Sequence, residues 1–279
     1  LDTLLITKDF IGQTGKAGVI ENWPGNTSVT GPELMTLFRD HLKVFSPEIS
    51  EGEVVMSMRK SDNGFIIETD KREIEAKSII IASGRNPRQL NAEGVEKFVG
   101  RGVSYCATCD VPLFSGKRVA VVGGGNSGFE TAIEVAERES PQVYLLEMAG
   151  KVLADEVLQE KVAKLKNIEV LTRVVPQRVD GDLLVKSLTY RDLALDQEKT
   201  IDIEGVFVEI GSIPVANFVK DLADCNEKGE IVIDQEYCST KTPGLFAAGD
   251  VTDIPYKQIV IAAGEGSKAA LSAYNYIKR

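Results

Sequence analysis

A glycine-rich turn that follows an apolar run is the feature that most constrains the fold of this chain. Residues 119–122 (VAVV) are typical of a buried strand, and Gly123, Gly125 and Gly128 follow at the spacing G-x-G-x-x-G. The first glycine allows a tight turn, the second lets a pyrophosphate approach the backbone, and the third lets the next helix pack closely on the strand. The N-terminus of that helix stabilises phosphates. We therefore predict a dinucleotide-binding β–α unit, and a purely structural glycine turn is the alternative.

A carboxylate stands where the second strand of such a unit is expected to end. Glu147 follows Gly128 by nineteen residues. A carboxylate at this place can hold both ribose hydroxyls of NAD and would repel a 2′-phosphate, and residues 148–151 (MAGK) contain no arginine for that phosphate. The sequence thus predicts NADH as the cofactor, preferred over NADPH, with Asn126 and Ser127 in the same binding loop. An exposed surface glutamate is the alternative for Glu147.

Two cysteines at C-x-x-C spacing precede this unit. Cys106 and Cys109 are followed directly by Asp110. Such a pair can close and reopen a disulfide, which is redox chemistry, and an adjacent carboxylate can exchange a proton with a thiolate. We interpret the three residues as a catalytic group beside a nucleotide site. A helix N-cap or turn is the alternative for Asp110.

The other cysteines leave two weaker interpretations of the C-x-x-C pair open. A zinc site would need a second pair of ligands, but Cys225 and Cys238 are separated by twelve residues and no histidine is near them. The pair could also be ordinary buried cysteines. His41 is the single histidine of the chain, so no metal site is predicted.

Composition excludes several classes of protein. The formal net charge is -10 and no basic block of five or six residues occurs, which argues against nucleic acid and an anionic membrane surface as partners. The longest apolar runs are of strand length, far short of a membrane span. With four cysteines among 279 residues the chain is no disulfide scaffold, and we expect a cytoplasmic location.

The order of elements indicates an α/β fold of two domains. The first domain is expected to hold a strand at residues 1–7, a helix opened by Gly31-Pro32, a hairpin over 54–69 and a strand at 78–82. A hinge at 83–87 leads to a second strand–helix series from about residue 116, with strands that include 168–175, 184–191 and 205–210. A return hinge at 211–214, a strand before Gly249-Asp250 and a helix over 257–277 complete the pattern.

Several stretches together resemble one enzyme family. They are the ENWPG stretch at 21–25, the CATCD stretch at 106–110, the glycine loop at 123–128, Gly249-Asp250 and the YKQI stretch at 256–259. The chain resembles low-molecular-weight thioredoxin reductase and, as closely, the flavoprotein subunit of alkyl hydroperoxide reductase. The resemblance covers nearly the whole chain.

The resemblance implies two Rossmann-like nucleotide-binding domains of the FAD/NAD(P) type, each with three layers (ββα). The FAD-binding domain would comprise residues 1–87 and 214–279, and the NAD(P)H-binding domain with the dithiol would be inserted as residues 88–213. The residues that would contact FAD are Gly12, Gln13, Asn22, Gly249, Asp250, Lys257, Gln258 and Ile259.

The resemblance also implies the activity. Electrons would pass from NADH (or NADPH) through FAD to the disulfide between Cys106 and Cys109, with Cys109 facing the flavin and Cys106 attacking the partner. The partner would be a thioredoxin-like protein or, alternatively, a peroxiredoxin, and the enzyme would be a homodimer. One domain would swivel against the other, at the two hinges, during turnover.

Two features depart from the family pattern. Residues 146–150 (LEMAG) replace the arginine-rich segment of thioredoxin reductases, which is closer to the NADH-using peroxide reductase flavoprotein. The family also opens with a strand and a G-x-G-x-x-G of its own, whereas Leu1 already corresponds to the second strand. We therefore expect an N-terminally truncated chain without the main FAD phosphate site. A nucleotide-binding module without turnover and a ferredoxin-driven relative are further alternatives, the latter disfavoured by the intact glycine loop and Glu147.

Overall fold

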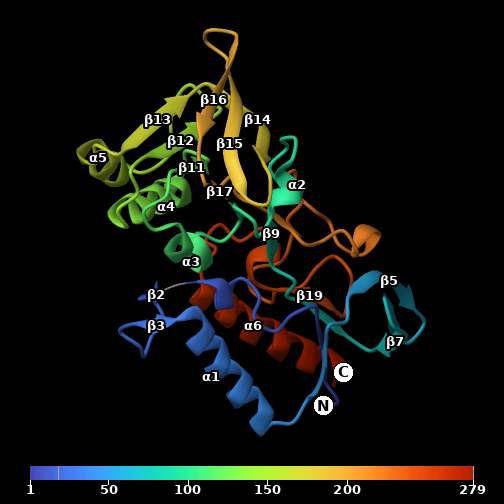
Figure 1. The fold of residues 1–279 in the computed structure, drawn as a ribbon. Helices are drawn as coiled ribbons and strands as arrows, with labels where there is room; N and C mark the ends of the chain where they lie inside the picture. Colours follow the sequence, from blue (N-terminus) through green and yellow to red (C-terminus); the bar gives the residue numbers. More distant parts are fainter. Residues whose placement is uncertain (18, 279) are drawn as a thin grey trace. The chain divides into compact units, whose positions relative to one another are not determined.

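The chain folds into two compact units, one inserted in the other. A computed structural model describes residues 1–17 and 19–278. Backbone alone is described for Val19, Thr108, Cys109 and Lys220. Unit 1 comprises Leu1–Asn86 and Ile213–Arg279, and unit 2 is Pro87–Ser212 (Figure 1). Both boundaries fall within the segments expected as hinges, residues 83–87 and 211–214.

Unit 2 is built on a parallel sheet of five strands in the order β10-β17-β11-β12-β13. Every residue of β11 and β17 is buried, as expected for a sheet that is covered on both faces. In sheet order, the strands span Val103–Ser104, Gly205–Val208, Val119–Val122, Val143–Glu147 and Ile168–Thr172.

Helices cover one face of this sheet and a second sheet covers the other (Figure 1). Because successive strand residues point to opposite faces, Val119 and Val121 pack against the helices α4 (Asn126–Glu137) and α5 (Glu156–Lys164). Ala120 and Val122 pack against the antiparallel sheet β14-β15-β16. Unit 2 therefore has the predicted three-layer ββα fold. Its remaining elements are β14 (Val174–Gly181), β15 (Val185–Asp192), β16 (Gln197–Asp202), α2 (Val95–Phe98), α3 (Ala107–Asp110) and the 3-10 turn η2 (Val111–Phe114).

The second sheet differs from the sequence prediction at two places. The single strand predicted over residues 168–175 is two strands, because the backbone at Arg173 is left-handed (φ 58°) and turns the chain between β13 and β14. The edge strand β16 was not predicted, since it is polar and none of its residues is buried. Its pairing with β15 is a product of tertiary structure.

Unit 1 contains several small sheets. Two of them are parallel pairs, β1-β4 and β8-β19, and the predicted hairpin forms β5-β6, extended by β7. The strands are β1 (Leu4–Thr7), β2 (Val19–Ile20), β3 (Val29–Thr30), β4 (Glu48–Glu51), β5 (Val55–Ser61), β6 (Gly64–Thr69), β7 (Glu73–Ala76), β8 (Ile79–Ile81) and β19 (Leu245–Ala247).

Two long helices accompany these strands. α1 (Gly31–Val44) begins where predicted, since Pro32 occupies its first turn and Thr30 and Glu33 form a capping box. α6 (Ile259–Ile277) contributes Ala269 and Ala273 to the main core of the unit. Short 3-10 turns lie at η1 (Thr14–Lys16), η3 (Lys220–Leu222) and η4 (Gly249–Val251). In the described part of the chain, no helix is both long and apolar enough to span a membrane.

The two segments that connect the units pair with each other. β9 (Arg85–Pro87) and β18 (Ser212–Pro214) form a two-stranded sheet. Beyond its ends, the Arg88 amide donates to the Gly211 carbonyl (2.9 Å) and the Val215 amide donates to the Gly84 carbonyl (3.0 Å). The chain thus leaves unit 1 and returns to it at adjacent points.

Candidate functional site

The glycine loop of unit 2 lies at the carboxyl end of β11, where the strand passes into α4. Gly123 has φ 125° and its amide donates to the Leu146 carbonyl (2.8 Å). A Cβ on Gly128 would lie 1.8 Å from the Gly123 carbonyl oxygen, whereas one on Gly125 would meet nothing within 4 Å. Two glycines are therefore required by packing, and Gly125 leaves open space beside the loop, as a pyrophosphate requires.

The N-terminus of α4 faces this open space. Its N-cap, Gly125, provides no side-chain capping bond, so the first amides of the helix are left for a ligand. Asn126 is fixed by two 2.8 Å bonds with Asp155, one from its amide nitrogen to the carboxylate and one to its amide oxygen from the Asp155 backbone. Ser127 is exposed in the first turn of α4. The structure brings together all the loop residues predicted from the sequence.

Glu147, at the end of β12, lies against the glycine loop. Its Oε2 accepts a 2.7 Å bond from the Gly124 amide and its Oε1 accepts one of 2.7 Å from the Ala149 amide. These bonds fix a half-buried carboxylate at the loop, so the alternative of a free surface glutamate does not describe it. Both oxygens keep lone pairs that could accept hydroxyl groups.

An arginine that sequence reasoning missed lies close to the same corner. A Cβ on Gly150 would lie 3.2 Å from Nε of Arg173, and the Arg173 amide donates to the Ala149 carbonyl (3.0 Å). Arg173 follows β13, which pairs with β12, so the topology brings it near although it is distant in sequence. This corner therefore contains an arginine, although residues 148–151 contain none.

The dithiol segment begins at the carboxyl end of β10. Cys106 is the N-cap residue of α3 and is disulfide-bonded. Its amide donates to Oγ of Ser104 (3.0 Å). Asp110 ends α3 and occupies the N-cap position of η2, where it makes no side-chain capping bond. The side chain of Cys109 lies outside the described residues, and Cys225 and Cys238 are free thiols.

In unit 1, two of the predicted cofactor residues are joined by a hydrogen bond. Asn22 Nδ2 donates to Oε1 of Gln258 (2.8 Å). Gln258 is the N-cap of α6, and Ile259 packs as its first residue against the cluster around Leu34. Residues 236 positions apart in sequence thus meet at the N-terminus of α6.

The remaining predicted residues of unit 1 lie in turns. Gly12 has φ 55° and its amide donates to Asp9 (2.6 Å). Gln13 Nε2 donates to the Arg85 carbonyl (2.9 Å). Gly249, with φ 76°, opens the η4 turn, and its amide donates to Oε2 of the buried Glu265 (2.8 Å).

A buried ion-pair cluster connects Lys257 to the segment that leaves unit 1. Glu230 lies 2.9 Å from Arg85 and 3.3 Å from Lys257. Burial opposes ionisation of Glu230, but the Asn226 amide and the two cations hold its pKa below the ordinary value. Arg85 also reaches the Asp250 carbonyl (3.5 Å). Sequence reasoning missed Arg85 and Glu230, because no local motif marks them.

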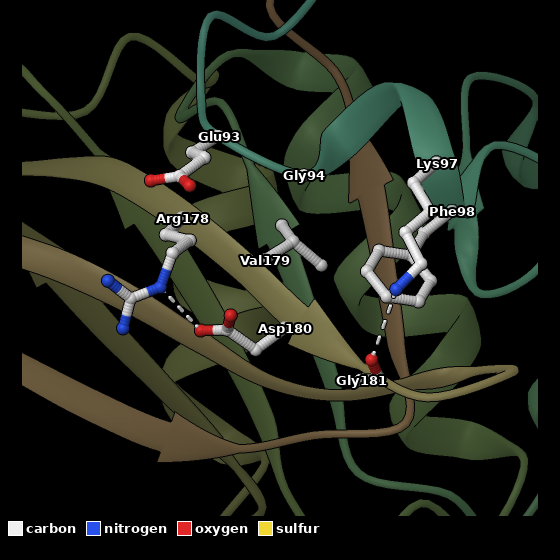
Figure 2. Close-up of a pocket in the computed structure, with 8 residues that line it drawn as sticks. All are labelled: Glu93, Gly94, Lys97, Phe98, Arg178, Val179, Asp180 and Gly181. Carbon is white, nitrogen blue, oxygen red and sulfur yellow. Dashed lines mark hydrogen bonds and ion pairs between the residues drawn. The ribbon is translucent and has the colours of Figure 1, made fainter.

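A small cavity elsewhere in unit 2 contains none of the predicted residues. It has a volume of about 120 Å³ and lies between α2 and β14. In Figure 2, Arg178 points toward Asp180, with which it forms an ion pair, and Lys97 points toward the Gly181 carbonyl. Among the described residues, no cluster of three possible metal ligands occurs.

Comparison with known proteins places this geometry in a family. A family model described as pyridine nucleotide-disulphide oxidoreductase matches residues 6–269. The chain belongs to this family. Membership implies a nicotinamide and a flavin cofactor.

Individual relatives agree with this family. The F subunit of alkyl hydroperoxide reductase from Pseudomonas putida is 40% identical over 274 residues, which are 97% of this chain and 52% of that protein. Thioredoxin reductase of Lactococcus lactis superposes with a TM-score of 0.87 at 34% identity, covering 99% of this chain and 91% of that one. That of T. acidophilum gives 0.84 at 34%, covering 100% and 99%. The chain spans about half the length of the curated relatives it matches.

The residues of the family's two sites fit these groups. In unit 2, the open space at Gly125 and the uncapped N-terminus of α4 suit a dinucleotide. In unit 1, Oε1 of Glu265, buried beside Gly249-Asp250, has no hydrogen-bond partner among the described residues. A polar ligand at this turn would supply a donor.

Proposed function

We propose that the chain is the reductase part of an NADH-dependent flavoenzyme that reduces a thioredoxin-like protein through a Cys106–Cys109 disulfide. One observation carries this proposal most strongly. β10 and β11 both run parallel to β17, which lies between them, so the disulfide-bonded Cys106 and the glycine loop follow strand ends at the same edge of one sheet. A nucleotide site and a redox disulfide on one edge suit electron transfer between them.

The residues of unit 2 would hold the nicotinamide cofactor and the dithiol. Gly123, Gly125 and Gly128 would admit the pyrophosphate, and Glu147 would accept the hydroxyls of the adenosine ribose. Arg173 near Gly150 is a cation that could attract a 2′-phosphate, so NADH preference rests on Glu147 alone.

The residues of unit 1 would bind FAD, which supplies a two-electron carrier between nicotinamide and disulfide. Asp250 would hold the ribityl chain, while Gln258 and Ile259 would present the positive end of α6 to the ring system. Gly12, Gln13, Asn22 and Lys257 would complete the contacts, since they lie in turns or near this helix end. The division into an FAD-binding unit 1 and an NAD(P)H-binding unit 2 follows from these assignments.

Reduction of the disulfide would consume two electrons and two protons and leave two thiols. Asp110 would hold the proton of the thiol at Cys109. The Cys106 thiolate would attack the partner disulfide, and Cys109 would then attack Cys106 to release the partner as a dithiol. A cytoplasmic homodimer is the further expectation from the resemblance and from composition.

A peroxiredoxin is the second candidate partner. The 40% identity to a protein named as the F subunit of an alkyl hydroperoxide reductase supports it, as does the carboxylate at Glu147. The two candidates share the chemistry of unit 2 and differ only in the disulfide that Cys106 attacks.

The test is Cys109→Ser in the flavin-loaded, full-length protein, with Cys225→Ser, a change at an exposed free thiol, as the matched control. We expect anaerobic NADH to bleach the flavin absorbance in both variants, while turnover of thioredoxin or peroxiredoxin disulfides is lost in Cys109→Ser only. Full disulfide reductase activity of Cys109→Ser would contradict the assignment. Faster turnover with one protein than with the other identifies the partner class.

A further inference from the structure

Glu209 lies where the strand order of the unit 2 sheet reverses. From β11 the chain proceeds to β12 and β13 on one side, and β17 returns on the other side of β11. In open parallel sheets, ligands bind in the crevice outside the carboxyl ends of the strands at such a reversal. Glu209 is the first residue after β17 and therefore stands at this crevice.

The contacts of Glu209 connect it to both structural glycines of the loop. Its amide donates to the Val122 carbonyl (2.7 Å). A Cβ on Gly123 would lie 2.2 Å from the Glu209 carbonyl oxygen, and one on Gly128 would lie 3.7 Å from Glu209 Cβ. The Glu209 side chain thus begins beside the loop that the dinucleotide pyrophosphate would approach.

The carboxyl group of Glu209 is poorly compensated. Its hydrogen bond in the described part of the chain is a long one, 3.5 Å from Thr131 Oγ1 on α4. Its pKa is raised to about 7, chiefly by burial and also by the charge of Glu130, while the Thr131 bond acts to lower it. The ionisable side chains on the other elements at this edge include the acidic Glu147 at the end of β12 and Asp110 on α3, and the basic Arg173 after β13.

A bound dinucleotide would bring the negative charge of its pyrophosphate to the loop beside Glu209. Added negative charge favours the neutral form of a neighbouring carboxyl group. We propose that Glu209 is a proton-binding residue of the dinucleotide site, and that it takes up one proton from solution when the dinucleotide binds. The proton returns to solution when the dinucleotide leaves, and no electron is transferred in this step. The proposal rests on the dinucleotide site of the proposed function.

The sign of the pH effect follows from this linkage. Below about pH 7 Glu209 is already neutral in the free protein, so affinity is at its highest there and independent of pH. At higher pH the proton must be bound together with the dinucleotide, so affinity falls by up to about tenfold per pH unit. Above the pKa of Glu209 in the complex, the affinity no longer changes with pH.

Isothermal titration calorimetry with NAD⁺ on the full-length protein tests the proposal without using the flavin or turnover. Titrations from about pH 6 to about pH 9, in buffers of different protonation enthalpy, give both the affinity and the number of protons taken up. We expect uptake and a falling affinity above about pH 7 for the wild type. Glu209→Gln should show neither, and should keep the affinity of the wild type at low pH. Glu130→Gln, an exposed neighbour on α4, is the matched control and should keep the pH dependence.

The outcomes separate this proposal from the one before it. If the wild type binds NAD⁺ without proton uptake, or if Glu209→Gln keeps the wild-type pH dependence, the role of Glu209 is wrong while the dinucleotide site stands. If the wild type binds no NAD⁺ at any pH, the dinucleotide site itself is wrong and the role of Glu209 is wrong with it. If Glu209→Gln does not fold, the number of protons that the wild type takes up on binding NAD⁺ tests the role of Glu209 by itself.

Discussion

The sheets of the two units differ in continuity. The five strands of unit 2 form one sheet, and its central strand β11 is buried at every residue. The parallel strands of unit 1 form two separate pairs, β1-β4 and β8-β19, and Leu5 and Ile80 in them are 37% and 39% exposed. The run at residues 78–82 is therefore less buried than predicted, because within the described residues β8 has a strand on one side only.

This difference shows two ways of building a cofactor site. In unit 2, β11, the glycine loop and α4 are contiguous in sequence, and close packing fixes the conformation of the loop. In unit 1, the predicted residues come from distant turns and are held by side-chain bonds, such as those of Asn22 to Gln258 and of Glu230 to Lys257. We expect substitutions in unit 2 to act through steric fit and substitutions in unit 1 to act mainly through charge and hydrogen bonding.

The largest expected effect is that of Gly128→Ala in unit 2. Its Cβ would lie 1.8 Å from the Gly123 backbone oxygen, so strand and helix must separate. We expect unit 2 to lose about 1–3 kcal/mol of unfolding free energy and NAD⁺ affinity to fall by at least about a hundredfold, roughly the loss of two good charge-assisted hydrogen bonds. Denaturant unfolding and calorimetry measure the two quantities.

Gly125→Ala is the matched control for this loop. Its Cβ would meet nothing within 4 Å, so stability should stay within about 0.5 kcal/mol, while affinity falls because the methyl group occupies the approach of the pyrophosphate. Wild-type NAD⁺ affinity in Gly128→Ala would show that packing does not fix the glycine loop.

An intermediate effect is expected on acidification of unit 1. Glu53 is buried, accepts hydrogen bonds from Ser50 and Thr69, and pairs with Arg72 (3.2 Å). The hydrogen bonds of Ser50 and Thr69 lower its pKa to about 2, below the ordinary carboxyl value. Because the folded-state pKa is depressed, its stabilising contribution is complete above the ordinary value and is lost as the pH falls toward 2.

Fluorescence of Trp23, the single tryptophan, follows unfolding in unit 1. We expect the denaturant midpoint to decrease as the pH is lowered from about 5 to about 2. Glu53→Gln should be less stable at neutral pH, and its midpoint should decrease less on acidification. Glu68→Gln, at an exposed carboxylate of β6, is the control. An unchanged acid dependence in Glu53→Gln would assign it to other carboxylates.

The smallest expected effect, of opposite sign to that of Gly128→Ala, is that of Gly264→Ala in unit 1. Gly264 lies inside α6 and a Cβ there would meet nothing within 4 Å. Alanine should stabilise the helix by about 0.5–1 kcal/mol, seen as a higher denaturant midpoint by Trp23 fluorescence. A decrease in stability would mean that another part of the protein packs against α6 at Gly264 in solution.

The sequence predicts what is local in this molecule. The fold of unit 2, the glycine loop and the start of α1 depend on neighbouring residues, and the structure agrees with all three. β16, Arg173, Glu209 and Glu230 were missed, since each acquires its role from partners that the topology brings close. Arg173 meets Gly150 only because β13 pairs with β12, and Glu209 meets the loop only because β17 pairs with β11. No pattern along the chain reports such proximity.

The pairing of β9 with β18 has a consequence for how the gene of such a protein can change. Gly84 and Val215 of unit 1 are joined by a 3.0 Å hydrogen bond, and Arg88 and Gly211 of unit 2 by one of 2.9 Å. A short peptide can therefore bridge either gap without moving the backbone. Recombination could therefore remove, exchange or transplant unit 2 as one segment, while unit 1 keeps a continuous chain.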